Sequence, residues 1–421
     1  MKRGGKPGLR RRRGLLSEAM NSEIATTRTT AGPRMALQYV LLFAGNGVAL
    51  PFIGLWLRAQ GLSGTEIGAL LAAPMLGRLL TGPAIALWAD GFRLRRTAIA
   101  ILALTTAAAY AAMLVVEGVW AWAALWFVAA TAFAAIIPLS DVMTLRIARR
   151  EGFSFSVPRG WGSVAFVGAS VAMGALLVGA SVDWVLGSTV GAALLMAGVA
   201  RWVLPAEPVN DGPPEPGWAR FAGLGRLVRD GRFMTAILAV GCVQATHAFY
   251  YGFATLAWKA QGLSEGTAGQ LWAVAVVVEI ALMWWVEPWR RRRGIGPWTV
   301  LGIGAGAAVA RWSALAFAPP LWMLWPLQGL HALTFAATYL AGVQLVERLS
   351  PPGAHTSAQT LSSMLSAGVL IGLATVSSGP LYDAVGVRGY LAMSGLAALG
   401  GMIGLVGAWR SRGPLAVRQI G

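Results

Sequence analysis

The chain of 421 residues is 56% hydrophobic, and only 12% of its residues are charged. A soluble protein of this length cannot enclose so much apolar material, because surface scaling limits the buried fraction, so these residues must face lipid. The net charge of +17 is spread over short loops between apolar runs, which favours a role in membrane orientation and argues against a nucleic-acid partner.

The first 34 residues differ from the rest of the chain. They hold nine Lys or Arg residues and no apolar stretch of the kind that a cleavable signal peptide needs before Met35. We expect residues 1–34 to be a disordered basic cytoplasmic tail. Met20 and Met35 are alternative start sites.

Twelve apolar runs are long enough to cross about 30 Å of hydrocarbon as helices. The first six are 35–57, 65–88, 97–116, 119–144, 160–180 and 184–204, and the second six are 233–258, 266–287, 296–317, 320–346, 358–380 and 387–409. We predict an all-α membrane protein with one six-helix bundle at 35–204, a proline-rich cytoplasmic linker at 205–232, a second six-helix bundle at 233–409 and a cytoplasmic tail at 410–421.

The basic residues of the loops lie almost entirely on one side of the predicted membrane. If the N-terminus is cytoplasmic, the outer loops keep only Arg58, Lys259 and Arg388. An asymmetry of this size predicts a multi-pass protein of the bacterial inner membrane with both termini in the cytoplasm.

One short segment occurs twice. Residues 58–63 read RAQGLS, and residues 259–264 read KAQGLS, an offset of 201 residues. Each copy joins one apolar run to the next, so we interpret it as the first hairpin of a duplicated half. The same offset relates Arg78 to Glu279. Matched charges near the midplane of two repeats are typical of a transporter.

A few ionisable residues lie inside apolar runs, where a charge costs about 2.5 to 3.5 kcal/mol. They are Arg78, Asp141, Arg159, Glu279, Arg311 and His331. Structural ion pairs that help helices pack are the alternative interpretation. Because both signs occur in both halves, we favour a function in solute and ion binding.

The twelve spans, the repeat and the long central linker resemble the major facilitator superfamily over nearly the whole chain after Met35. This resemblance implies two pseudo-symmetric bundles that expose a central site alternately to each side of the membrane. The loop 90–96, DGFRLRR, is similar to that superfamily's acidic-then-basic gating motif, with altered spacing. It implies that Asp90, Arg93, Arg95 and Arg96 hold the cytoplasmic side shut. An ordinary basic inner loop is the alternative.

A second resemblance involves the fourth, fifth, eighth, ninth and tenth spans. PLSD at 138–141 and RGWG at 159–162 resemble a segment of the proton-coupled sugar symporters typified by lactose permease. By this likeness Asp141 and Arg159 form a substrate-binding ion pair. Glu279, Arg311 and His331 are similar to that family's residues on the eighth, ninth and tenth helices. Thr334 departs from the family, which carries a proton-binding glutamate there.

The bacterial 3-phenylpropionate permease group gives a closer resemblance. It is carried by RGWGSVAFV at 159–167, HAFYYGF at 247–253 and AVVVE at 275–279, and by the order of His331 and Thr334. The resemblance implies proton-coupled symport of a small solute, an aromatic monocarboxylate such as 3-phenylpropionate. Oligosaccharide or nucleoside symport, and export of drugs in exchange for protons, remain alternatives.

Proton coupling has a physical basis in these residues. A carboxylate in a low-dielectric cavity takes up a proton more readily, whereas a nearby arginine opposes this. A substrate that competes for the arginine therefore changes the proton affinity of the carboxylate. We expect Glu279 to pair with Arg311, or with Arg78 across the repeat interface, and His331 to relay a proton or to orient its neighbours.

An aromatic acid also needs a grip on its carboxylate and a surface for its ring. Arg159 can hold a carboxylate with two parallel hydrogen bonds. The candidates to face the ring are Trp161, Tyr250, Tyr251 and Phe253, although most aromatic residues in membrane helices pack or anchor. His247 is a candidate substrate contact, and equally a histidine that only packs between helices.

Several classes of function are disfavoured. The single cysteine, Cys242, excludes an intrachain disulfide and a cysteine metal cluster. The sequence sets no nucleophile beside a base, so we expect neither an enzyme nor a bound metal or cofactor. The expected partners are a small solute, protons and the lipid bilayer, and we expect a monomer.

Overall fold

The computed structural model describes residues 31–209, 224–351 and 354–411. The basic tail up to residue 30, residues 210–223 of the linker and the end of the chain from residue 412 lie outside the described residues. Apart from short connections and an isolated bridge between Leu94 and Pro208, the described chain is helical.

The N-terminal half consists of six long helices. They are α2 (Ala31–Ala59), α3 (Gly64–Asp90), α4 (Arg95–Met113), α5 (Val119–Glu151), α6 (Ser156–Leu177) and α7 (Trp184–Gly198), which continues as a π-helical turn at Val199–Val203. The first helix begins at Ala31, four residues before the apolar run that predicted it. A short helix, α8 (Leu224–Arg229), leads into the second half.

The C-terminal half repeats this plan, but most of its membrane helices are interrupted. The pieces are α9 (Gly231–Ala245) and α10 (His247–Ala260); α11 (Glu265–Ala281), η3 (Leu282–Val286) and α12 (Glu287–Arg292); α13 (Pro297–Leu315); α14 (Leu321–Gly329), η4 (Ala332–Ala337) and α15 (Thr338–Leu349); α16 (His355–Ser363), η5 (Met364–Leu370) and α17 (Ile371–Val385); and η6 (Gly386–Gly389) with α18 (Tyr390–Ser411).

The described residues hold twelve helices that cross a membrane, as predicted. Ten stretches are long and apolar enough by themselves. One of these, Ser357–Ser411, contains two antiparallel crossings, and α13, packed against α15 and α18, supplies another. The fold is therefore all-α, with six membrane helices on each side of the linker.

The repeated hairpin has the same geometry in both halves. Gly61 and Gly262 adopt φ of 86° and 84°, a left-handed conformation that glycine tolerates best. Ser63 and Ser264 then cap α3 and α11 by accepting a backbone hydrogen bond from the first turn. The residues that the duplication retains are thus those that the turn and the cap require.

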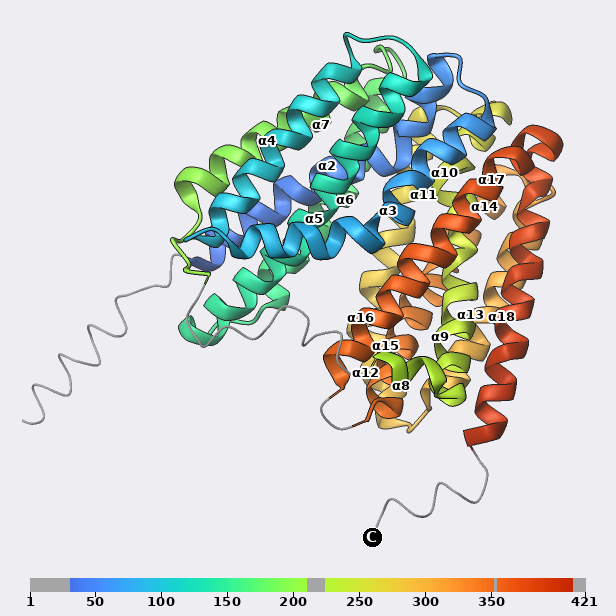
Figure 1. Cartoon of the computed structure of the whole chain (residues 1–421). Coiled ribbons are helices and arrows are strands. Elements are labelled where there is room, and N and C mark those ends of the chain that lie inside the picture. The colour runs from blue at the N-terminus through green and yellow to red at the C-terminus, as the bar shows by residue number, and fades with distance from the viewer. Residues whose placement is uncertain (1–30, 210–223, 352–353, 412–421) are drawn as a thin grey trace, which may run out of the picture.

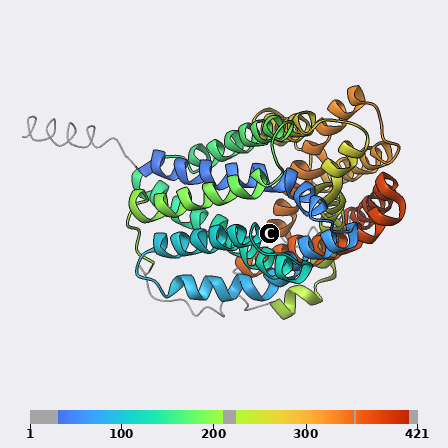
Figure 2. The same ribbon diagram turned by 90° about the horizontal axis from the view of Figure 1, so that it is seen from above.

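The two halves form separate bundles that meet at one end and diverge toward the other (Figure 1). They pack together where α3 meets α17, α6 meets α11, and α2 meets α10. The view from above shows the same division (Figure 2). We call the end with loops 60–63 and 261–264 the closed end, and the opposite end, with loops 91–94 and 293–296, the open end.

Candidate functional site

A chain of three ionisable side chains connects three helices inside the C-terminal bundle. Glu279 of α11 accepts from Nε2 of His331 at 2.9 Å, and Nη1 of Arg311 in α13 lies 2.8 Å from Nδ1 of the same imidazole. An arginine can only donate, so Nδ1 is the acceptor and the proton of a neutral His331 lies on Nε2. The imidazole therefore connects a buried cation to a buried carboxylate.

The guanidinium of Arg311 is completely enclosed. Its side chain has no exposed surface, and it donates to Oε1 of Gln328 at 3.0 Å and to the hydroxyl of Thr334 at 3.2 Å. The cation lies over the rings of Tyr250 and Trp312, with its central carbon 4.8 and 4.5 Å from the ring centroids. Hydrogen bonds and cation–π contacts thus replace part of the hydration that this charge gives up, and among the described residues Nε of Arg311 has no hydrogen-bond partner.

His247 extends the network to α10. Its Nδ1 faces the carbonyl oxygen of Gln244 at 3.1 Å, which requires a proton on that nitrogen. Its Nε2, 3.1 Å from the hydroxyl of Thr334, then accepts from that hydroxyl in the neutral ring. Thr334 therefore joins Arg311 to His247, at the position where the sugar-symporter resemblance would place a glutamate.

His247, His331 and Thr334 all lie at or beside interruptions of their helices. α9 ends at Ala245 and α10 begins at His247, so the histidine follows a break in its helix. His331 lies between α14 and the π-helical turn η4, which contains Thr334. Single π-helical turns occur frequently at functional sites, because they redirect side chains out of the regular helical order.

The charges of this group balance only while Glu279 is ionised. With His331 and His247 neutral, Arg311 carries one positive charge and Glu279 one negative charge in a site from which water is largely excluded. A proton on Glu279 removes the negative charge and leaves the buried guanidinium without a counter-charge, which is costly in a low-dielectric interior. An anion brought nearby would restore the balance.

A second ion pair lies in the N-terminal bundle. Nε of Arg159 in α6 is 3.8 Å from Oδ1 of Asp141 in α5, and the two side chains are 33% and 31% exposed. Tyr39 of α2 donates its hydroxyl to the same oxygen of Asp141 at 2.6 Å. The guanidinium lies 4.1 Å from the ring centroid of Phe43. Unlike Arg311, Arg159 is partly exposed to solvent. Its ion pair with Asp141 is a single contact that is too long for a hydrogen bond.

Close packing of α2 on α6 sets the position of Phe43. A Cβ atom on Gly162 would lie only 2.7 Å from Cδ2 of the Phe43 ring. The glycine that follows Trp161 therefore leaves room for the ring that covers Arg159. This gives a physical reason for one of the glycines in the RGWG segment.

The other residues proposed to contact the substrate do not share one site, because they differ in burial and in neighbours. Tyr250 and His247 are fully buried in the Arg311 network, and Tyr250 donates its hydroxyl to Gln328 at 2.8 Å. Tyr251 is only partly buried and stacks on Trp272. Trp161 is 55% exposed and lines an apolar pocket with Leu37 and Val157, so it does not share the surroundings of Arg159.

Arg78 lies on an exposed face of α3. Within the described part of the chain, the ion-pair partner of Glu279 is His331, and no ion pair joins Glu279 to Arg78. Of the two partners considered for Glu279, the structure thus connects it with Arg311, through the imidazole, and not with Arg78.

The basic loop at 93–96 contacts the first part of the linker in its own half. Arg95 donates to the carbonyl of Val209 at 2.7 Å, and Arg96 donates to the carbonyl of Leu204 at 2.7 Å. The amide of Val209 donates to the carbonyl of Arg93, and Asp90 is exposed. In this conformation these contacts fasten the linker to the N-terminal bundle, whereas the gating resemblance implies contacts that close the two halves.

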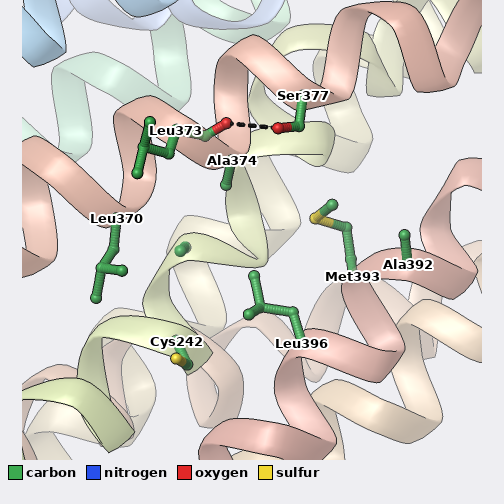
Figure 3. Close-up of a pocket in the computed structure, with 9 residues that line it drawn as sticks. Cys242, Leu370, Leu373, Ala374, Ser377, Ala392, Met393 and Leu396 are labelled. Atoms are coloured by element: carbon green, nitrogen blue, oxygen red, sulfur yellow. Dashed lines mark hydrogen bonds between the residues drawn. The ribbon is translucent and has the colours of Figure 1, made fainter.

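The apolar pockets do not coincide with the buried charges. Figure 3 shows a pocket of about 250 Å³ between α9, α17 and α18, lined by Cys242, Leu373 and Met393 among others. Its one hydroxyl, on Ser377, already donates to the carbonyl of Leu373 at 2.9 Å. We therefore define the candidate site by its ionisable residues. Among the described residues, no His, Cys, Asp and Glu side chains cluster as a metal site.

Five residues of these groups were not identified from the sequence as functional: Tyr39, Phe43, Trp272, Trp312 and Gln328. Tyr39 and Phe43 are four residues apart and so lie on one face of α2, but aromatic residues are common in apolar helices. Gln328 is a polar residue within an apolar run three positions before His331, a signal that could have identified it.

Comparison with known proteins gives a consistent family. Residues 33–392 match the sequence model of the MFS_1 like family. The chain is 30% identical over 365 residues to the probable 3-phenylpropionic acid transporter of Escherichia coli (strain K12), covering 84% of this chain and 91% of that protein. It is 26% identical over 371 residues to the maltose permease of Geobacillus stearothermophilus, covering 85% and 89%.

Solved structures share the fold at lower identity. The nucleoside transporter NupG superposes with a TM-score of 0.76 at 16% identity, over 90% of this chain and 99% of that chain. A bacterial homolog of the human lysosomal transporter Spinster, in an inward-facing and unoccupied conformation, gives 0.73 at 15% identity, over 91% and 97%.

Proposed function

Because the chain belongs to the MFS_1 like family and is a multi-pass transporter of the major facilitator superfamily, we propose that it carries an aromatic monocarboxylate, such as 3-phenylpropionate, into the cell together with a proton. The relative that is 30% identical bears the name of a probable 3-phenylpropionic acid transporter, which supports this substrate class.

The observation that carries the proposal is the state of Arg159. Its guanidinium is one-third exposed, one face is covered by Phe43, and its contact with Asp141 is a single one at 3.8 Å. A planar guanidinium in this state retains donors for a carboxylate, which it binds best through two parallel hydrogen bonds. The neighbouring ring of Phe43, which is only partly buried, supplies an apolar surface for the rest of an aromatic acid.

The enclosed group of Glu279, His331 and Arg311 is the proposed proton site. Its side chains are between 0% and 15% exposed, so they can exchange a proton but offer little surface to a substrate. Protonation of Glu279 leaves an uncompensated cation in the C-terminal half, and a carboxylate bound at Arg159 adds a negative charge to the N-terminal half. This compensation favours joint binding of a proton and an anion.

The direction of opening follows from the loop charges. The open end carries clusters of basic residues at 93–96 and 290–293, which the positive-inside rule places in the cytoplasm. We therefore interpret the described conformation as inward-facing. In alternating access, the two bundles rock about the central site so that the closed end opens in turn.

Uptake into proteoliposomes tests the substrate and the coupling together. With an inside-alkaline pH gradient, we expect the purified protein to accumulate labelled 3-phenylpropionate, and we expect accumulation to stop when a protonophore removes the gradient. An excess of unlabelled 3-phenylpropionate should compete, whereas maltose and uridine should not. Competition by maltose or uridine alone would instead support the sugar or nucleoside alternative.

Two variants of Arg159 test the proposed carboxylate contact. Arg159→Ala should raise the KM for 3-phenylpropionate by more than about tenfold. It removes the charge-assisted hydrogen bonds to the carboxylate, and a loss of roughly 1.4 kcal/mol in binding free energy corresponds to tenfold in affinity. Arg159→Lys should recover only part of this loss, since an ammonium cannot form the two parallel bonds. Accumulation by Arg159→Ala at the wild-type KM would contradict the proposed substrate contact.

A further inference from the structure

A carboxylate of the C-terminal half caps a helix of the N-terminal half at the closed end. Oδ1 of Asp383, near the end of α17, accepts from the amide of Gly64 at 2.7 Å, and Oδ2 accepts from the amide of Thr65 at 2.7 Å and from its hydroxyl at 2.8 Å. Gly64 and Thr65 are the first residues of α3, whose amides have no partner within their own helix. Asp383 therefore satisfies them from the other bundle.

The helices approach closely enough for this contact because small residues face each other. A Cβ atom on Gly64 would lie 2.5 Å from Oδ1 of Asp383, and a Cβ atom on Gly379 would lie even closer to the carbonyl oxygen of Gly64. Ser63 and Glu66 already satisfy other groups of the α3 start through a capping box. The two amides that remain are those that Asp383 binds.

An arginine of the repeated hairpin also faces this carboxylate. Nη2 of Arg58 lies 3.8 Å from Oδ1 of Asp383, and its guanidinium lies over the ring of Tyr382 at 5.9 Å. In the second copy of the repeat, the equivalent Lys259 pairs with Glu265 of its own half. Equivalent basic residues thus have different partners, and of the two it is the side chain of Arg58 that pairs across the interface between the bundles.

We propose that Asp383, with Gly64, Thr65 and Arg58, forms a latch that holds the closed end shut and opens when the bundles rock apart. This inference rests on the proposed alternating access. Asp383 and Arg58 keep side-chain exposures of 34% and 41%, so water can replace each partner when the latch opens. A carboxylate at a helix N-terminus is stabilised by the helix dipole and by its charge-assisted bonds, which favours the shut state without locking it.

Distance measurements by double electron–electron resonance test the latch directly. In a Cys242→Ser background, which removes the one native cysteine, spin labels replace Val115 of the N-terminal half and Phe317 of the C-terminal half. Both side chains are highly exposed, at 82% and 75%, in loops of the closed end. Asp383→Asn should raise the population with the longer label separation by roughly tenfold, and Thr65→Ala should raise it less.

Glu265→Gln is the matched control. It removes a carboxylate at the same end of the molecule whose partner, Lys259, belongs to its own half, and it should leave the distance distribution unchanged. If Asp383→Asn gives the same distribution as Glu265→Gln and the parent, the latch is refuted. The measurement needs no transported solute, so a failure to take up 3-phenylpropionate would refute the proposed substrate and leave the latch standing.

Discussion

Glu279, His331 and Arg311 combine two demands that are rarely met together, burial and charge. Arg311 has no exposed surface, yet it has acceptors in His331, Thr334 and Gln328 and two aromatic rings beneath it. Each ring nitrogen of His331 has a defined role, one as acceptor and one as donor. A change of charge at Glu279 therefore alters the electrostatic environment of Arg311, because only one imidazole separates the two groups.

Replacement of Glu279 by glutamine should separate exchange from accumulation. The amide keeps an oxygen that can accept from His331, but it cannot take up a proton. We expect Glu279→Gln to lose accumulation driven by a pH gradient by more than about tenfold. Exchange of labelled for unlabelled substrate across the membrane, which needs no net proton movement, should persist. Both are measured in the same proteoliposomes, and gradient-driven accumulation at the wild-type level would contradict the role of Glu279.

The same variant leaves Arg311 as an unpaired buried cation. Removal of one partner from a buried pair typically costs about 3 kcal/mol, so Glu279→Gln should lower the thermal unfolding temperature. Adding Arg311→Gln removes the remaining charge and should recover part of that loss, although Arg311→Gln alone is also destabilising. Additive losses in the double variant would show that the two charges are not coupled.

Residues of this kind are only partly visible in a sequence. A charge within an apolar run, such as Glu279, is conspicuous because insertion is costly. The direction in which its side chain points cannot be read from the sequence, because a helix with apolar residues on all sides has no polar face to mark its orientation. Trp161 and Arg159 are two positions apart on α6, so they point to nearly opposite sides of the helix and face different surroundings. Tyr39 carries no signal that separates it from the packing aromatics of its helix.

At the scale of elements, helix lengths follow from the sequence and helix interruptions do not. Apolar runs bounded by Gly-Leu-Ser turns fix where α3 and α11 begin, because turn and cap chemistry are local. The break at Thr246 and the π-helical turn at Ala332–Ala337 depend on contacts with other helices, among them the bond from Trp312 to Thr246 at 2.8 Å. Local propensity cannot predict them.

Packing of α2 against α6 gives a prediction for the substrate site. Gly162→Ala adds a methyl group that would meet Phe43 at 2.7 Å, so the ring must shift from its present position over Arg159. We expect the KM for 3-phenylpropionate to rise by about three- to tenfold, since such shifts cost roughly 1 kcal/mol. The maximal rate driven by the pH gradient should change less, because the Glu279 group lies in the other bundle.

Gly168→Ala is the control for this change. It lies on the same helix and no side chain or backbone atom would be within 4 Å of the added Cβ. It should leave the KM at the wild-type value. An equal rise of the KM in both variants would indicate a general effect on α6, and an unchanged KM in Gly162→Ala would mean that Phe43 does not position Arg159.

At the scale of the whole molecule, the duplication explains the architecture but not the conformation. The repeated hairpin predicts two similar bundles, and composition predicts the membrane. Which end is open depends on contacts such as those of α3 with α17 and of α6 with α11, and these join residues that are far apart in the sequence. The gating resemblance of Arg95 and Arg96 likewise could not reveal that, in this conformation, they contact the start of the linker.

Cysteine accessibility tests the orientation on which the inward-facing interpretation depends. In the Cys242→Ser background, Val115→Cys places a thiol at the closed end and Glu347→Cys places one on the exposed surface near the open end. Because the basic loops at the open end should remain in the cytoplasm, a membrane-impermeant maleimide should label Val115→Cys in intact cells and Glu347→Cys only after permeabilisation. The reverse pattern would place the open end outside and make the described conformation outward-facing.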